Sequence, residues 1–139
     1  MRLEHSIRVA ATPDRLWQVL TDVTAWPDFV DTVTAVESLD GGSLAVGSRY
    51  KLQQPKLPEN TWTVTELTEG RSFTWEASSP GVRVVASHEI SSTAGPTTLR
   101  LEVTQSGWLA STLGRLTAGM TRRYLDLEAT AMKARAEAG

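Results

Sequence analysis

Apolar residues follow two different periods in two parts of the chain, and this change constrains the fold more than any other feature. Between about residues 32 and 106 they alternate with polar residues, which indicates strands with one buried face. Over the last thirty residues they recur at steps of three and four, as on one face of a helix. The residues of this face are Leu109, Leu113, Leu116, Met120, Tyr124, Leu127 and Ala131. A long helix with one apolar stripe must bury it, and the preceding sheet is the natural partner.

Residues 2–10 alternate in the same way, so the sequence predicts seven strands. Turn residues separate most of them, as at Asp40-Gly41-Gly42, Pro80-Gly81 and Ala94-Gly95-Pro96. Because short turns join sequential strands, we expect an antiparallel meander. The predicted strands cover residues 2–10, 32–39, 47–54, 60–69, 72–79, 82–92 and 96–106.

Helices are predicted in two places. Thr12 and Pro13 suit the cap and first position of a short helix, and a second helical turn is expected around residues 28–30. The C-terminal helix is predicted over about residues 108–137, roughly 40 Å long if unbroken. Gly114 and Gly119 each weaken it by about 1 kcal/mol relative to Ala. Residues 107–119 are therefore expected as a separate turn or a looser first half.

The pattern predicts one α+β domain over residues 1–139. A sheet of seven strands is too wide to stay flat, so strand twist should curl it around the C-terminal helix. The expected order is one strand, two short helices, six strands and the long helix. Because a curved sheet and one helix cannot bring all their side chains together, we expect volume between them.

Composition narrows the function. The net charge is −2, so the composition does not indicate a basic surface for binding nucleic acid. The chain has no cysteine, which excludes disulfides and thiolate chemistry. No segment reaches the roughly 20 apolar residues of a membrane span, so neither stable membrane insertion nor a signal peptide is predicted. We expect a cytoplasmic protein, a monomer or homodimer, without metal or cofactor. Two histidines without a supporting carboxylate cluster are too few for a metal site.

The motifs together resemble the START-related superfamily, also called SRPBCC, and within it the polyketide cyclase/dehydrase-like proteins. The matching residues are Ala11 to Trp17, Leu20, Asp22, Trp26-Pro27, Gly47-Ser48-Arg49, Trp62-Thr63-Val64, Phe73-Thr74-Trp75, Gly107, Arg123-Tyr124 and Leu127-Glu128. The resemblance implies the helix-grip fold and a hydrophobic cavity. It implies no single reaction, since members bind lipids, carry hormones or cyclise polyketides, and fold alone is a poor guide to function.

Strand parity and the helical stripe select the candidate ligand contacts. They are Tyr50, Trp62, Trp75, Ala86, His88, Val103, Gln105, Met120 and Tyr124. Each apolar position among them is equally compatible with plain core packing. Glu66 shares the parity of Trp62 and Val64, but Leu67 beside it indicates a bulge or parity change, so Glu66 is not placed in the pocket.

His88 is the candidate catalytic residue, because it lies among apolar neighbours on an inward strand face. A histidine there can act as general acid or base, or orient a ligand carbonyl or hydroxyl. The alternative is a core histidine held by one hydrogen bond. Gln105 and Tyr124 are the polar groups that could assist it, with Gln54, Thr117 and Thr121 as weaker candidates.

Three functions remain open from the sequence. The first is binding of a small hydrophobic molecule, such as a lipid, isoprenoid or polyketide-like ring. The second is a cyclase or dehydratase that uses His88 as general acid or base. The third is an interaction module that acts through its sheet edge or helix face without a ligand.

Overall fold

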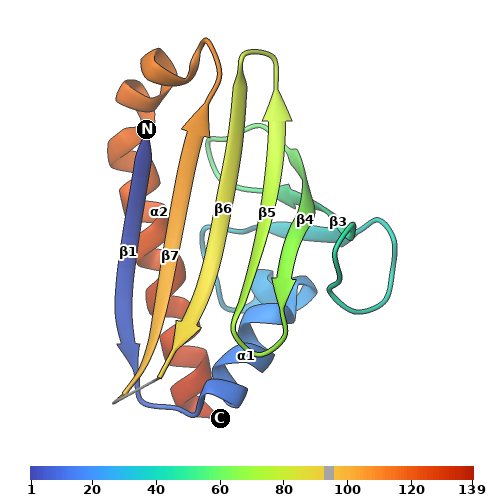
Figure 1. The fold of residues 1–139 in the computed structure, drawn as a ribbon, viewed down its shortest axis with the longest axis vertical. Helices are drawn as coiled ribbons and strands as arrows, with labels where there is room; N and C mark the ends of the chain where they lie inside the picture. Colours follow the sequence, from blue (N-terminus) through green and yellow to red (C-terminus); the bar gives the residue numbers. More distant parts are fainter. Residues whose placement is uncertain (93–95) are drawn as a thin grey trace.

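The structure is a computed structural model that describes residues 1–92 and 96–139. Its elements follow the predicted order (Figure 1). They are β1 (Arg2–Val9), α1 (Pro13–Thr21), the 3₁₀ helix η1 (Val23–Asp28), β2 (Ala35–Ser38), β3 (Arg49–Gln53), β4 (Asn60–Thr68), β5 (Ser72–Ser79), β6 (Val82–Ser91), β7 (Thr97–Ser106) and α2 (Ala110–Ala138).

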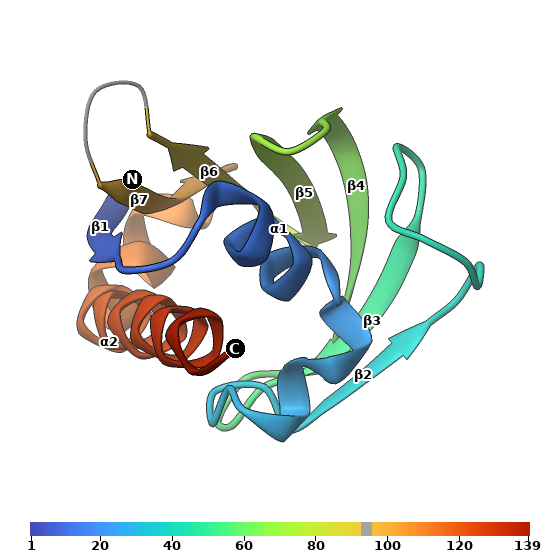
Figure 2. The same cartoon turned by 90° about the horizontal axis from the view of Figure 1, so that it is seen from below.

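The strands of the described residues form one antiparallel sheet in the order β1-β7-β6-β5-β4-β3-β2. The sheet curves around α2, which packs against β1 and β7 at one edge (Figure 2). This confirms the predicted α+β helix-grip fold. Strands β2 and β3 are shorter than predicted, and Ala94 and Gly95 of the expected last turn lie outside the described residues.

The two short helices close one end of the molecule. Thr12 caps α1, since its Oγ1 accepts a hydrogen bond from the backbone N–H of Arg15 at 3.1 Å. The second helical turn is η1, a few residues earlier than the predicted position at 28–30. Trp26 anchors it: its ring is almost fully buried, and its Nε1 donates to the carbonyl of Leu20 at 3.2 Å.

Strand β4 contains the predicted irregularity. The register with β5 shifts between Val64 and Glu66, which marks a bulge. Val64 is buried and Glu66 is exposed. The parity change therefore keeps Glu66 outside the concave face, as expected.

The C-terminal helix differs from its prediction in two respects. It runs without a break from Ala110, which excludes the separate turn expected over residues 107–119 and leaves the other alternative, a looser first half. Leu116 and Leu127, both assigned to the buried face, are exposed. The buried stripe of the second half consists of Leu125, Ala129, Met132 and Ala136. This stripe is rotated by roughly a third of a turn from the predicted face, at 100° per residue. The prediction missed it because two of its residues are alanines, which the spacing of the leucines could not reveal.

Two glycines set where α2 begins. Gly81, in the β5–β6 turn, and Gly107, before α2, both have positive φ, 82° and 111°. A Cβ on Gly107 would overlap the backbone carbonyl of Gly81, and one on Gly81 would meet Leu109 Cδ1 at 2.7 Å. The N–H of Leu109 donates to the Gly81 carbonyl at 2.9 Å. The start of the helix is thus held directly against the tip of the sheet.

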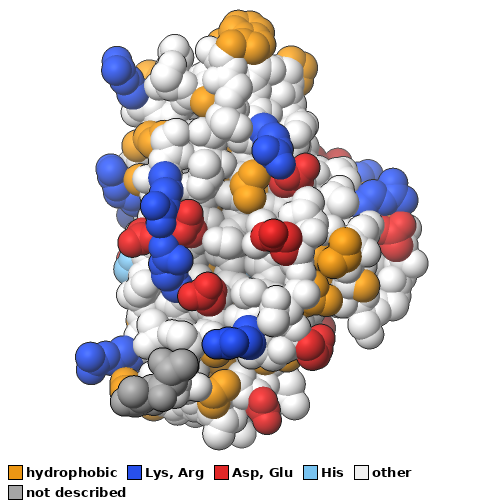
Figure 3. Space-filling model, viewed as in Figure 1, with side chains coloured by type: hydrophobic (Ala, Val, Ile, Leu, Met, Phe, Trp, Pro, Cys, Tyr) orange, Lys and Arg blue, Asp and Glu red, His pale blue; other side chains and the backbone are white. Residues whose placement is uncertain are grey.

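The convex face of the sheet carries paired charges (Figure 3). Glu102 lies 2.8 Å from Arg2 and 2.9 Å from Arg100, and Arg83 pairs with Glu76. Exposed pairs of this kind contribute little stability individually. Among the described residues, no helix is long and apolar enough to cross a membrane.

Candidate functional site

An internal cavity of about 260 Å³ lies between the concave face of the sheet and the first half of α2. Strands β3 to β7 line one side of it and α2 the other. Its main lining residues are Trp26, Leu52, Gln54, Trp62, Trp75, Val84, Ala86, His88, Leu101, Val103, Gln105, Leu113, Thr117, Met120, Thr121, Tyr124, Leu125 and Glu128. Its lining is mostly apolar with a few polar groups, as in small-molecule pockets.

Ala86 explains part of the volume. In the sheet it lies between Trp75 of β5 and Val103 of β7, its partners in register. Its neighbours on the same face of β6 are the larger Val84 and His88. A single methyl group in the middle of this face cannot reach α2, so space remains above it.

Aromatic rings form one wall of the cavity around Trp75. The centroid of its ring lies 5.6 Å from that of Trp62, 5.4 Å from Trp26 and 5.3 Å from Phe73. The contacts with Trp26 and Phe73 are edge-to-face, a favoured arrangement of aromatic rings. Since neighbouring rings hold it on several sides, Trp75 forms a rigid surface for a bound molecule.

His88 is fixed from two directions. Its ring stacks on Phe73, its cross-strand partner, with centroids 4.1 Å apart and planes 10° from parallel. Its Nδ1 lies 3.2 Å from the Phe73 carbonyl, and an N–H at this position can donate to it. That tautomer leaves Nε2 free on the other side of the ring.

Glu128 of α2 faces that free nitrogen. Its Oε1 lies 3.7 Å from His88 Nε2, and both side chains are largely buried, 15% and 4% exposed. With Nδ1 as donor, Nε2 and the carboxylate face each other as two acceptors, and a proton on either would make them donor and acceptor. Both groups lie at the cavity wall, just beyond hydrogen-bond distance of each other.

Several buried polar atoms have no hydrogen-bond partner among the described residues. They are Thr32 Oγ1, Trp62 Nε1, Gln105 Oε1 and Glu128 Oε1. Three of these four residues line the cavity. Because buried polar groups normally find partners, this wall has hydrogen-bonding capacity that a bound molecule or water can satisfy.

The cavity reaches the surface beside the start of α2. Among its lining residues Pro58, Ser79 and Leu113 are exposed, and they come from the β3–β4 link, the end of β5 and the first turns of α2. The Tyr124 hydroxyl donates to the Pro55 carbonyl and so ties that link to the helix. We refer to this opening as the mouth.

The predicted ligand contacts come together with one exception. Trp62, Trp75, Ala86, His88, Val103, Gln105, Met120 and Tyr124 all line the cavity, as do Gln54, Thr117 and Thr121. Tyr50 does not. It is buried on the concave side, but it lies at the end of β3 next to the loop around Ser43 and lines a different hollow there, whereas Leu52 on the same strand lines the cavity. Whether the cavity residues contact a ligand remains a prediction.

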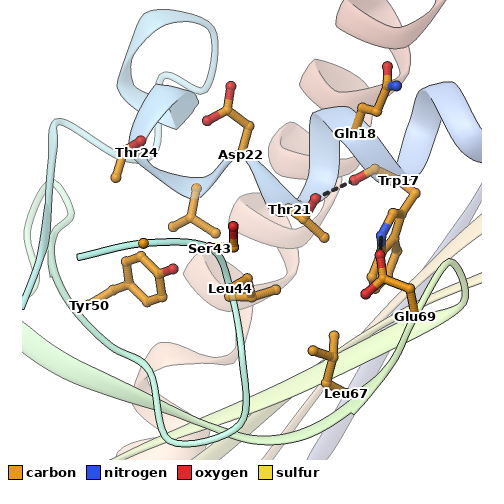
Figure 4. A pocket seen from close by; sticks show the side chains of 12 residues that line it. Trp17, Gln18, Thr21, Asp22, Thr24, Ser43, Leu44, Tyr50, Leu67 and Glu69 are labelled. Carbon is orange, nitrogen blue, oxygen red and sulfur yellow. Dashed lines mark hydrogen bonds between the residues drawn. The ribbon is translucent and has the colours of Figure 1, made fainter. Parts of the chain in front are cut away.

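The hollow beside Tyr50 lies at the surface between α1 and the loop around Ser43 (Figure 4). Its volume is about 530 Å³. Trp17 Nε1 donates to Glu69 Oε1 at 3.2 Å on one side of it. Burial raises the pKa of the Tyr50 phenol, and the carboxylate of Asp40 adds to the shift. Its described residues bring no pair like His88 and Glu128 together.

Sequence reasoning did not place Glu128 in the site. It is one turn beyond Tyr124 and two turns beyond Met120, so its helical position agrees with the cavity face. The prediction missed Glu128 because only apolar residues were used to define the face of the helix that packs against the sheet. A carboxylate in register with a cavity-facing tyrosine was the available indication.

Proteins of several different kinds have known structures with this architecture. The Zhui aromatase/cyclase from Streptomyces sp. R1128 superposes with a TM-score of 0.80 at 22% identity, covering 99% of this chain and 93% of the other. Major latex-like protein 151 from Panax ginseng gives 0.79 at 12% identity, covering 96% and 95%. A norcoclaurine synthase point mutant from Thalictrum flavum, in complex with a transition-state analogue, gives 0.76 at 14%, covering 98% and 93%. At these identities the likeness establishes the fold alone.

Sequence comparison supplies the family. No curated protein is similar enough to count as a match. A family profile described as polyketide cyclase/dehydrase and lipid transport matches residues 1–137. With nearly the whole chain inside that match, this protein belongs to the polyketide cyclase/dehydrase and lipid transport family.

Proposed function

We propose that the chain binds a compact hydrophobic molecule with at least one hydrogen-bonding group in the cavity between the sheet and α2. The observation that carries the proposal is the lining: aromatic and aliphatic side chains surround the volume, and the buried pair His88 and Glu128 lies in its wall. The unpartnered atoms of Trp62, Gln105 and Glu128 support a ligand with polar substituents rather than a plain hydrocarbon.

The volume supports a compact ligand. At about 260 Å³ the cavity is just below the roughly 300–1,000 Å³ of pockets that hold drug-sized molecules. A short isoprenoid or a polyketide-like molecule of one or two rings suits this size better than a long-chain lipid. The rigid ring of Trp75 favours a planar guest, which can pack against an aromatic surface.

Binding can be tested with 1-naphthol, a two-ring probe with one hydroxyl group, followed by quenching of tryptophan fluorescence. Ala86→Phe fills the centre of the cavity and should weaken binding at least tenfold. Glu89→Phe adds the same ring at an exposed position on β6 and should leave binding unchanged. Met120→Phe fills the cavity from the helix side and provides a second test should Ala86→Phe fold poorly. Equal affinity in all folded variants would refute the proposal.

A second candidate function is acid–base catalysis of a cyclisation or dehydration. The specific observation in its favour is the 3.7 Å approach of His88 Nε2 to Glu128 Oε1 beside the cavity. In a dehydration, Nε2 takes the proton next to a ketone, Glu128 stabilises the imidazolium, and the same proton returns to the leaving hydroxyl, which departs as water. The family and the similarity in fold to the Zhui aromatase/cyclase support this class of reaction.

Dehydration can be assayed with 3-hydroxy-1-tetralone, which loses water to give fluorescent 1-naphthol. General acid–base help is worth roughly 10²–10⁴-fold, so His88→Ala and Glu128→Gln should each lower turnover by about 10²-fold. His5→Ala removes the other histidine, which lies outside the cavity, and should have no effect. Unchanged turnover in His88→Ala would refute the role of His88 in this reaction, and no turnover by the wild type would leave the cavity with binding alone.

A further inference from the structure

Large apolar side chains are exposed where α2 begins. Trp108, just before the helix, is 79% exposed, and Leu116 is 77% exposed. Leu113 between them is exposed as well and also lines the cavity. Isolated exposed apolar residues are common, but here they come from one short stretch beside the mouth.

The same stretch is cationic. Residues 107–125 contain Arg115, Arg122 and Arg123 and no acidic residue, in a chain whose net charge is −2. All three arginines are exposed, and none forms an ion pair in the described part of the chain. This differs from the convex face of the sheet, where arginines and glutamates pair with each other.

Helix geometry gathers the three arginines and Leu116 on one side of α2, while Trp108 precedes the helix and its ring lies beside Gly81 in the β5–β6 turn. Arg115 and Arg122 are seven residues apart, and so are Leu116 and Arg123, so the two pairs form adjacent rows along α2. Thr117 and Met120, which line the cavity, point about half a turn away from Arg115 and Arg122. We call Trp108, Arg115, Leu116, Arg122 and Arg123 the docking face.

We propose that the docking face binds the surface of a bilayer that contains anionic lipids. Tryptophan and leucine enter the boundary between headgroups and acyl chains, while arginines pair with anionic headgroups. Trp108 and Leu116 are largely exposed and line neither the cavity nor the hollow beside Tyr50, which suits a deformable bilayer better than a shaped protein partner. Figure 3 shows exposed hydrophobic side chains at the top of the molecule, the end at which α2 begins in Figure 1.

Docking would place the mouth beside the membrane. Leu113 belongs both to the cavity lining and to the exposed apolar stretch, so the two sites are continuous. A hydrophobic ligand could then pass between bilayer and cavity with little exposure to water. This transfer rests on the proposed ligand binding, whereas membrane docking itself does not.

The test is co-sedimentation of the full chain with phosphatidylcholine vesicles, with and without phosphatidylglycerol, at low salt. The wild-type chain should bind the anionic vesicles and release as salt rises. Each arginine near an anionic surface is worth about fivefold in partitioning, so Arg115→Glu with Arg122→Glu should lower binding at least 25-fold. Trp108→Ser should weaken binding several-fold.

Two matched controls lie elsewhere on the surface. Arg8→Glu makes the same charge change on β1, and Val46→Ser removes an exposed apolar residue from a loop. Both should bind vesicles almost as the wild type does. The proposal is overturned by an absence of anionic vesicle binding, or by equal losses in control and docking-face variants. The proposal is also overturned if the docking face binds an acidic protein and the chain binds no vesicles.

Failure of docking can be distinguished from failure of ligand binding. Binding of 1-naphthol is measured in solution without vesicles, and the docking-face variants should retain it. If the docking-face variants retain 1-naphthol binding while neither they nor the wild type bind vesicles, the cavity proposal stands and the docking proposal falls.

Discussion

The two halves of α2 serve different purposes within one continuous helix. The second half buries Leu125, Ala129, Met132 and Ala136 against the core, each at most 5% exposed. The first half buries only Ala110 and Gly114 fully, and its larger side chains face the cavity or the solvent. One helix can thus stabilise the fold with one half while the other half borders a cavity.

The largest effect should come from the tightly packed half. Met132 is fully buried, and Met132→Ala should cost about 2–5 kcal/mol, as other large-to-small core substitutions do. Met120→Ala is the matched change in the first half, where the side chain borders a cavity, and should cost about 1 kcal/mol or less. Urea unfolding followed by circular dichroism gives both values. Equal costs would show that the two halves pack alike.

A smaller effect should distinguish the two glycines of the first half. A Cβ on Gly119 meets nothing within 4 Å, so Gly119→Ala should stabilise the chain by about 0.5–1 kcal/mol through helix propensity. A Cβ on Gly114 would lie 3.1 Å from Gln105 Oε1 and from Met1 Cε, so Gly114→Ala should gain less or lose stability. Thermal unfolding compares the two variants. A larger gain at Gly114 would mean that this part of the helix is loosely seated.

The smallest effect concerns the end of the packed half. Hydrogen bonds from Lys133 and from the backbone N–H of Ala10 hold the pKa of Glu137 below its ordinary value. Because its folded pKa is the lower one, Glu137 stabilises the fold above the ordinary carboxyl pKa, and this contribution disappears as pH falls through the folded pKa.

Glu137→Gln should therefore reduce the loss of stability on acidification. The Glu37 carboxylate is exposed and makes no hydrogen bond or ion pair in residues 1–92 and 96–139, so Glu37→Gln is the control and should leave the acid slope unchanged. Unfolding by urea at a series of pH values measures both slopes. The same change in both variants would remove the assigned role of Glu137.

Much of the sheet could be predicted from sequence because its signals are local. Alternating residues and turn glycines located the strands, and Leu67 beside Glu66 indicated the bulge in β4. His88 was also found this way, since a polar residue on an apolar strand face stands out. These inferences require only neighbours along the chain.

Other features depend on contacts between distant segments and could not be predicted. The buried face of α2 includes Ala129 and Ala136, whose burial depends on how closely the helix approaches β1. Tyr50 has the right parity, but its position along β3, next to the loop around Ser43, places it in another hollow. The pairing of Glu128 with His88 joins residues 40 positions apart, and only the tertiary fold brings them together.

The contact between Gly81 and Gly107 has a consequence for how such a cavity can be resized. Neither glycine lines the cavity, yet a side chain on Gly107 would overlap the backbone of Gly81 and so push the start of the helix away from the hairpin tip. A change there would widen the entrance without altering one lining group. The width of the cavity entrance and the chemistry of its wall can therefore vary independently in this architecture. The junction of the two glycines governs the width, and the lining side chains govern the chemistry.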